Sequence, residues 1–145
     1  MSQLSLTITL HAPVEKVFAA FSQPEQLVQW FAPGDAVVVQ VMSSFTEGGK
    51  YTLTMQESSG QQFQLIGQYM QIEENAHLRY SWAWADTLED TLITEVDVVF
   101  VEADPNTTSL TLTHSGFVND AERDQHQHGW IDCLEKLSRL MLSSD

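Results

Sequence analysis

His114 is the residue whose type and position in this sequence best suit acid–base chemistry. It shares its alternation with Leu110 and Leu112, so its side chain should point to the same apolar side of a strand. An imidazole there could exchange a proton near neutral pH or hydrogen-bond a ligand. We favour the alternative, a partly buried histidine held by a neighbouring polar group. The sequence contains no nucleophile–base motif and no dinucleotide or phosphate-binding glycine loop, so no catalytic residue is predicted.

Asp124, His126 and His128 form the most metal-like cluster of the sequence. Asp124 and His128 are separated by one helical turn and could share one face of a helix. His126 and His128 would point about 200° apart and could not chelate one ion together on a regular helix. We therefore interpret the cluster as the solvated start of a helix near a pocket mouth. Neither a metal ion nor a cofactor is predicted.

Cys133 is the one cysteine of the chain, so an internal disulfide and a cysteine-rich zinc site are excluded. Its nearest charged neighbours, Asp132 and Glu135, oppose formation of a thiolate. We expect a small core side chain rather than a reactive thiol. Gly129 lies one turn earlier, before Trp130. Because glycine inside a helix costs about 1 kcal/mol relative to alanine, Gly129 predicts a close helix–sheet contact.

Large aromatic side chains with polar tips are typical of ligand pockets. Tyr80, Trp82 and Trp84 alternate along one expected strand and would form an aromatic row, either as a cavity wall or as a tightly packed core. Trp30 and Phe31 end a short helix and would form a rim or, as we favour, a plug. The residues predicted to line a pocket are Trp30, Tyr51, Phe63, Tyr69, Tyr80, Trp82, Trp84, Phe100, His114, His126, Trp130 and Leu134.

The elements that must position these residues follow from the spacing of apolar side chains. Residues 3–10, QLSLTITL, alternate as a half-buried strand. Pro13 suits the first position of a helix, and Pro24 restarts a second short helix that ends before residues 32–35. Six strands follow with short links, which predicts an antiparallel meander. They are expected at about residues 36–41, 51–56, 61–72, 78–84, 92–100 and 110–114.

Two of these strands carry specific expectations. In the strand 61–72 the apolar alternation changes from Phe63 and Leu65 to Ile66 and later residues, and Gly67 lies at the change. A bulge or a close backbone approach is therefore predicted at Gly67. In the strand 92–100, Leu92 is placed on the apolar face.

The last segment has helical spacing. Asn119 followed by Glu122 is typical of a helix start, and Trp130 and Leu134 begin a helical apolar stripe. A helix over about 120–142 would be roughly 34 Å long and must bury this stripe against the sheet. The order β-α-α-β6-α predicts an α+β fold in which a curved antiparallel sheet of six or seven strands wraps around a long C-terminal helix and leaves a space.

Composition limits the class of protein. The chain has 145 residues, 43% of them hydrophobic, and six basic against twenty acidic residues give a net charge of −14. One domain, residues 1–145, is expected. Phosphate backbones and anionic membranes repel such a surface, so neither nucleic acid nor membrane is a predicted partner. The sequence has no apolar run of about 20 residues and no signal-peptide pattern, which favours a cytoplasmic protein.

Three stretches that cover nearly the whole chain resemble one family. They are HAPVEKVFAAFSQPEQLVQWFAP, then EGGKYTLTM with GQYMQIEENAHLRYSWAW, then LTLTHSGF with HGWIDCLEKL. The chain resembles bacterial proteins similar to the C-terminal domain of the activator of heat-shock-protein-90 ATPase, in the START-like or polyketide cyclase/Bet v I-like superfamily. This resemblance implies a helix-grip fold with a cavity between sheet and helix. It also implies binding of small molecules, cyclase activity in some members and chaperone interaction in others.

Three functional hypotheses follow. The first is a module that binds an apolar or amphipathic small molecule, oriented by His114 or by tyrosine hydroxyls. The second is a cyclase, dehydratase or hydrolase that uses His114 as acid or base, and it rests on analogy because no catalytic motif supports it. The third is a protein that contacts a heat-shock chaperone. A homodimer formed through sheet edges is a further hypothesis.

Overall fold

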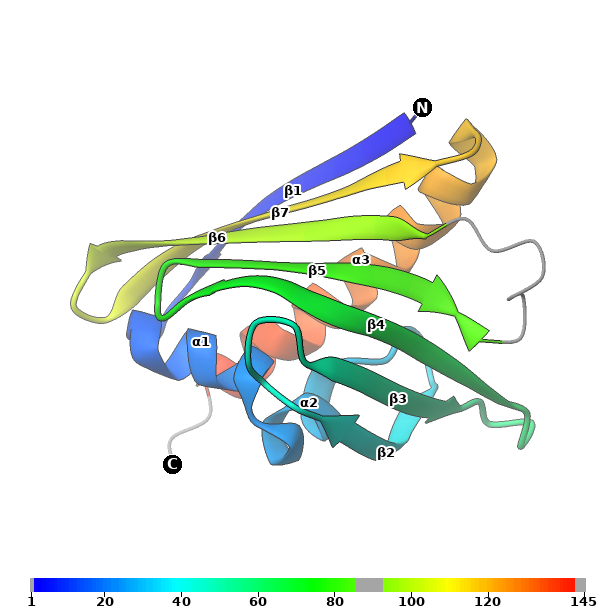
Figure 1. Cartoon of the computed structure of the whole chain (residues 1–145). Helices are drawn as coiled ribbons and strands as arrows, with labels where there is room; N and C mark the ends of the chain where they lie inside the picture. The colour runs from blue at the N-terminus through cyan, green and yellow to red at the C-terminus, as the bar shows by residue number, and fades with distance from the viewer. Residues whose placement is uncertain (1, 86–92, 143–145) are drawn as a thin grey trace.

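The computed structural model describes residues 2–85 and 93–142, which form one antiparallel sheet and three helices (Figure 1). The predicted helix-grip fold and element order are confirmed. Leu92 lies outside the described residues. The elements are β1 (Ser2–Leu10), α1 (Val14–Ser22), α2 (Pro24–Trp30), β2 (Val37–Ser43), β3 (Lys50–Gln56), β4 (Gln62–Glu73), β5 (His77–Trp84), β6 (Thr94–Asp104), β7 (Thr107–Phe117) and α3 (Asp120–Leu142).

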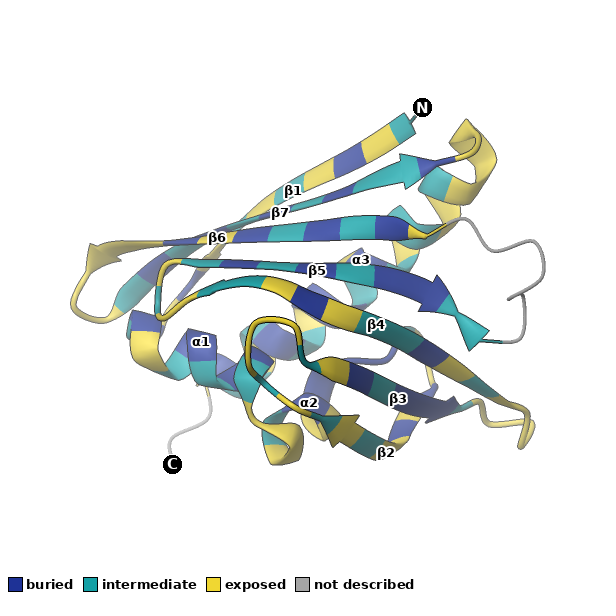
Figure 2. Cartoon of the chain, viewed as in Figure 1, coloured by how far each residue is buried: buried dark blue, intermediate teal, exposed yellow. Residues whose placement is uncertain are grey.

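The sheet has seven strands in the order β1-β7-β6-β5-β4-β3-β2. Strands β2 to β7 form the predicted meander, and β1 pairs with β7 as an edge strand of the sheet. The long helix α3 crosses one face of the sheet, and α1 and α2 pack at one end of that same interior (Figure 1). The alternating burial colours of Figure 2 follow from this arrangement, because successive side chains of a strand point to opposite faces.

Glycine at position 67 marks a close approach, although the expected change of alternation lies elsewhere. A Cβ atom at Gly67 would lie 2.2 Å from the Ser81 carbonyl oxygen and 2.5 Å from the Tyr51 ring, so only glycine fits there. The buried face continues through Tyr69, and the strand register shifts just after it. Met70, one of the later residues expected on the apolar face, is therefore exposed. The sequence pattern placed the shift too early because Gly67 has no side chain to report its face.

Helix α3 has the bounds expected from the sequence. The Asn119 side-chain oxygen accepts a hydrogen bond of 2.9 Å from the Glu122 backbone N–H, as the capping pattern predicts. Pro24 is the first residue of α2. Pro13 was expected at the first position of α1 but lies one residue before it, at the N-cap. Among the described residues, no helix combines the length and apolar character that a membrane crossing requires.

Candidate ligand-binding site

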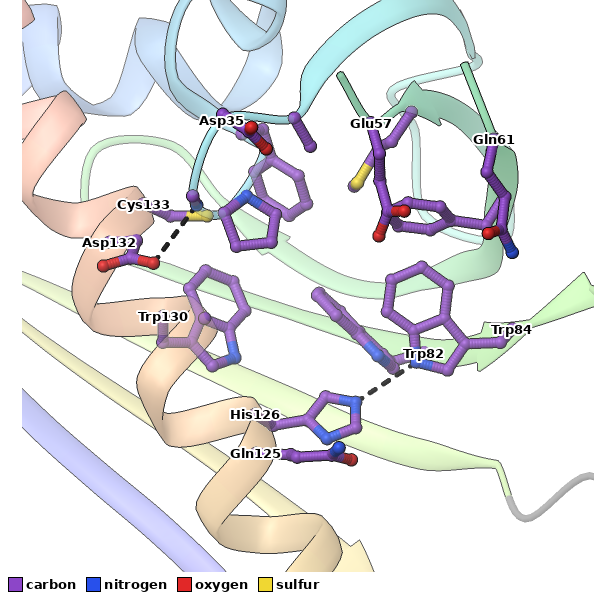
Figure 3. Close-up of a pocket in the computed structure, with 17 residues that line it drawn as sticks. Asp35, Glu57, Gln61, Trp82, Trp84, Gln125, His126, Trp130, Asp132 and Cys133 are labelled. Carbon is purple, nitrogen blue, oxygen red and sulfur yellow. Dashed lines mark hydrogen bonds between the residues drawn. The ribbon is translucent and has the colours of Figure 1, made fainter. Parts of the chain in front are cut away.

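A cavity of about 700 Å³ lies between the sheet and the N-terminal half of α3, and we call it the aromatic cavity (Figure 3). Its walls come from β5, from α3, from the loop between α2 and β2, and from the β3–β4 hairpin. The lining residues are Phe31, Pro33, Gly34, Asp35, Ala36, Met55, Glu57, Gln61, Phe63, Trp82, Trp84, Gln125, His126, Gly129, Trp130, Asp132 and Cys133.

Three tryptophans form one wall of the aromatic cavity. The Trp82 ring lies 5.2 Å from the Trp130 ring and 5.6 Å from the Trp84 ring, centre to centre, so the aromatic row expected from alternation extends onto α3 (Figure 3). The Trp84 indole N–H donates a hydrogen bond of 3.1 Å to His126 Nε2. The buried Trp82 N–H has no hydrogen-bond partner among the described residues, so the Trp82 side chain is held by ring packing and not by a hydrogen bond of its own.

The structure brings five of the twelve residues predicted for a pocket to the aromatic cavity, and it places the others deeper. Three tyrosines surround a second, small cavity of about 20 Å³, which we call the tyrosine end. Four residues line neither cavity and are buried in the core. The five residues at the aromatic cavity are Phe63, Trp82, Trp84, His126 and Trp130. The three tyrosines are Tyr51, Tyr69 and Tyr80. The four core residues are Trp30, Phe100, His114 and Leu134.

His114 is fully buried behind the tryptophan wall, and its hydrogen bonds define its tautomer. The Trp130 indole can only donate, and its N–H lies 3.1 Å from His114 Nδ1, so Nδ1 is the acceptor. Nε2 then carries the proton and donates over 2.7 Å to the Thr94 hydroxyl. That hydroxyl donates in turn to the Trp82 carbonyl oxygen at 3.1 Å. This chain of bonds ties two wall tryptophans to β6.

The surroundings of His114 keep it neutral. Burial, and secondarily the nearby His126 ring, lower the pKa of His114 from 6.5 to about 2. Both ring nitrogens are already used in hydrogen bonds, and a second ring proton would point at the Trp130 N–H. The geometry therefore matches the interpretation that we favoured, a histidine held by polar neighbours, and it gives His114 no open position for acid–base work on a substrate.

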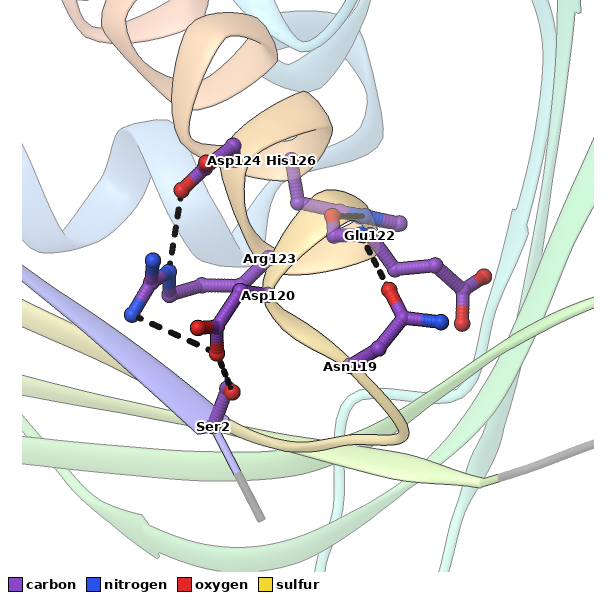
Figure 4. Close-up of polar contacts among 7 residues, drawn as sticks. All are labelled: Ser2, Asn119, Asp120, Glu122, Arg123, Asp124 and His126. Carbon is purple, nitrogen blue, oxygen red and sulfur yellow. Dashed lines mark hydrogen bonds and ion pairs between the residues drawn. The ribbon is translucent and has the colours of Figure 1, made fainter.

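His126 supports the wall from the first turns of α3. Its Nε2 accepts the Trp84 N–H, so Nδ1 carries the proton and donates to the Glu122 carbonyl oxygen at 2.9 Å. Figure 4 shows this first turn, where the Ser2 hydroxyl of β1 also donates to the Asp120 carboxylate. That bond, and secondarily Arg123, lower the pKa of Asp120. The first two turns of α3 are thus bonded to β1 through Ser2 and to β5 through Trp84.

The helical face that enters the cavity has a spacing that the sequence analysis did not use. His126, Gly129, Trp130 and Cys133 follow the i, i+3, i+4, i+7 pattern of one helix face, and all four line the cavity. The expectation that Gly129 allows a close helix–sheet contact is wrong. A Cβ atom there would meet only Pro33 of the α2–β2 loop, at an ordinary 3.6 Å. Gly129 instead leaves space in the cavity.

Loop and hairpin residues complete the site and were missed in the sequence. The α2–β2 loop contributes Gly34, whose backbone N–H donates to the Asp132 carboxylate of α3 over 3.1 Å. The hairpin contributes Glu57 and Gln61. Alternation signals report only residues inside strands, so they could not find these residues. Met55 was within reach, because it shares the buried face of β3 with Tyr51.

Titratable groups of the site do not form a metal centre or a reactive thiol. Burial raises the pKa of the Cys133 thiol to about 12, so the thiol stays protonated at neutral pH. Among the residues described, no group of three or more histidine, cysteine, aspartate or glutamate side chains could hold a metal ion. The cavity lining presents aromatic rings, carboxylates and amides.

A seven-stranded sheet around a long helix, with a hollow between them, defines a helix-grip protein. The chain belongs to the family described as Activator of Hsp90 ATPase homolog 1-like protein, which matches residues 11–141. The fold of this family commonly binds hydrophobic ligands. No curated protein matches the sequence of this chain.

Solved structures of bacterial proteins share the fold. A protein from Chromobacterium violaceum is 23% identical, with a TM-score of 0.87 and 98% of each chain covered. A protein of the same family from Silicibacter pomeroyi is 24% identical, with a TM-score of 0.85 and 97% of each chain covered. A protein from Mesorhizobium loti is 22% identical, with a TM-score of 0.80 and 99% of each chain covered. At these identities the likeness concerns the fold alone.

Proposed function

We propose that this protein binds an apolar or amphipathic small molecule in the aromatic cavity. The observation that carries the proposal is the cavity itself, about 700 Å³ in volume and lined by five aromatic side chains. Ligand sites are typically concave, mostly apolar and about 300–1,000 Å³ in size, with a few polar groups that orient the ligand. Gln61, Gln125 and the carboxylates of the lining supply such groups.

The cavity walls are held in place before any ligand arrives. His114 bonds Trp130, His126 bonds Trp84, and Asp132 bonds the α2–β2 loop. A site whose side chains are already ordered loses less conformational entropy on binding. Stacked and edge-on ring contacts add about 0.5–1.5 kcal/mol each beyond simple burial. A planar or ring-containing ligand therefore fits this wall best.

Substitutions at Gly129 test the proposal without disturbing the core. Gly129→Leu would place a side chain in the cavity from a good helix former, whereas Gly129→Ala adds only a methyl group in ordinary contact with Pro33. We expect wild type and Gly129→Ala to bind the neutral dye Nile red and to quench or shift tryptophan emission. We expect Gly129→Leu to lose this binding while it keeps its far-UV circular dichroism spectrum.

Thermal unfolding gives a second measurement of the same binding. A ligand at a hundredfold excess over its Kd should raise the free energy of unfolding by about 2.7 kcal/mol. A panel of apolar ligands, lipids and aromatic polyketides extends the test beyond the dye. The proposal fails if Gly129→Leu binds as wild type does, or if neither the dye nor the panel changes the wild-type protein.

Two other functions from the sequence stay predictions. Catalysis through His114 finds no support in the site, because its two ring nitrogens are occupied by hydrogen bonds to Trp130 and Thr94 and His114 does not line the cavity. Contact with a heat-shock chaperone is suggested by the family's description, and an ATPase assay with the cognate chaperone tests it.

A further inference from the structure

We infer that the aromatic cavity takes an organic cation with an apolar body, its positive group lying near Asp35 and Glu57. This inference rests on the proposed binding function and names the class of ligand. It combines two features of one cavity, the sign of the charges at the rim and the indole rings that line the inside.

The charged groups that line the cavity are all acidic. Asp35, Glu57 and Asp132 contribute carboxylates, while no lysine or arginine lines the cavity within the described ranges. Asp132 already accepts the Gly34 N–H. Asp35 and Glu57 are exposed, and no described residue forms an ion pair with either. In Figure 3, Glu57 points from the hairpin toward the side where Trp84 lies.

Two basic side chains close to the cavity are engaged by other protein groups. Lys136, one turn after Asp132, donates its amine to the Ala32 carbonyl oxygen and does not line the cavity. His126 does line the cavity, but its Nε2 accepts the Trp84 N–H and its Nδ1 faces the Glu122 carbonyl oxygen. These two bonds suit an imidazole that carries one proton, on Nδ1, and therefore no charge. An anionic ligand would therefore lose its hydration and find no positive partner.

The ring faces suit a cation for a separate reason. Trp84 uses its N–H edge to bond His126, and Trp130 uses its N–H edge to bond His114, which fixes both rings by their edges. The face of an indole ring carries partial negative charge and attracts a cation within about 6 Å. The net charge of −14 adds a field of the same sign. A cation is favoured by the rim, the walls and the whole chain.

Three probes that share a phenylbutyl body separate charge from shape. They are the trimethylammonium cation, its neutral tert-butyl isostere and the sulfonate anion. By calorimetry in about 10 mM NaCl, we expect the cation to bind roughly tenfold more tightly than the isostere and the sulfonate to bind weakest. In about 500 mM NaCl the difference between cation and isostere should shrink, because salt screens the rim carboxylates.

Single neutralising substitutions locate the effect. We expect Glu57→Gln and Asp35→Asn each to reduce the cation preference by about two- to fivefold, the range of an exposed ion pair. Glu102→Gln, at the far β6–β7 end of the sheet, removes the same charge and is the matched control, with no expected effect (Figure 1). Circular dichroism checks that each variant is folded.

The outcomes distinguish this inference from the function on which it rests. Equal affinity for cation and isostere, or a preference for the sulfonate, would overturn the choice of a cation and leave small-molecule binding intact. An equal loss in Glu57→Gln, Asp35→Asn and Glu102→Gln would assign the preference to net charge and overturn the role of the rim. Absence of binding by all three probes would overturn the choice of a cation, and if Nile red also fails to bind, the proposed function fails with it.

Discussion

The two ends of the interior between sheet and helices are built from similar residues and packed very differently. The tyrosine end is covered by α1 and α2, and its rings leave a space of only about 20 Å³. The other end, which we call the tryptophan end, holds the aromatic cavity of about 700 Å³. Phe31 lines both spaces and so stands between them. Aromatic content alone therefore does not decide whether such an interior is filled or hollow.

The difference comes from what covers each end. At the tyrosine end, Phe21 and Leu27 from the two short helices fill the layer. At the tryptophan end, a loop and a hairpin form the cover, and Gly129 withholds a side chain from the helix face. Loops cannot fill a layer as a packed helix does, because they lack a continuous apolar stripe. The hollow end is thus a product of its covering segments.

The largest expected effect contrasts two tryptophans, one from each side of Phe31. Trp30 is 1% exposed, donates to the Ala20 carbonyl oxygen at 2.9 Å and packs edge-on against Phe21, so Trp30→Ala should cost about 3–5 kcal/mol of unfolding free energy. Trp84 is half-buried at the cavity, so Trp84→Ala should cost less than about 2 kcal/mol. Urea unfolding measures both values. Equal losses would contradict a division of the interior into filled and hollow ends.

The sequence predicted the face of the sheet on which these rings lie, but not which part of that face is hollow. Alternation correctly placed Tyr80, Trp82 and Trp84 on one face, because face is a period-2 property. Alternation carries no information on how far along the sheet a helix or a loop covers that face. The twelve expected residues were therefore divided between two cavities and the core. The α3 spacing that includes Gly129 was the one available signal for a hollow.

Acid should destabilise the protein through His114, which lies behind the tryptophan wall of the aromatic cavity. Because the pKa of His114 is about 2 when folded and 6.5 when free, the unfolded chain binds a proton first as pH falls. The stabilisation from a neutral His114 is complete above pH 6.5 and is lost progressively below it. Between about pH 7 and about pH 5 this residue should remove about 2 kcal/mol of unfolding free energy.

A non-titrating variant isolates that contribution. His114→Gln should show a smaller loss between the two pH values than wild type does, by about 2 kcal/mol, whatever its stability at neutral pH. His128→Gln, an exposed histidine on the same helix as the wall, is the control and should keep the wild-type pH dependence. Identical pH dependence in wild type and His114→Gln would show that the buried network tolerates a proton.

The smallest expected changes in unfolding free energy concern two hydroxyl groups at the tyrosine end, and they test whether that end is filled. Burial raises the pKa of Tyr51 and Tyr80 well above the ordinary value, so both hydroxyls stay protonated. The Tyr51 hydroxyl donates to the Ser81 carbonyl oxygen at 2.5 Å, whereas the buried Tyr80 hydroxyl has no partner among the residues described. We expect Tyr51→Phe to lower the free energy of unfolding by about 1 kcal/mol and Tyr80→Phe to raise it by up to about 1 kcal/mol.

The sign for Tyr80→Phe decides more than its size. A gain in stability would mean that the hydroxyl is a tolerated cost of close packing, as expected for a filled end. A loss of about 1 kcal/mol or more would mean that something bonds the hydroxyl in solution, and the small cavity would then take a water or the polar end of a ligand. That result would make the tyrosine end a polar site rather than a filled one and would end the contrast between the two ends.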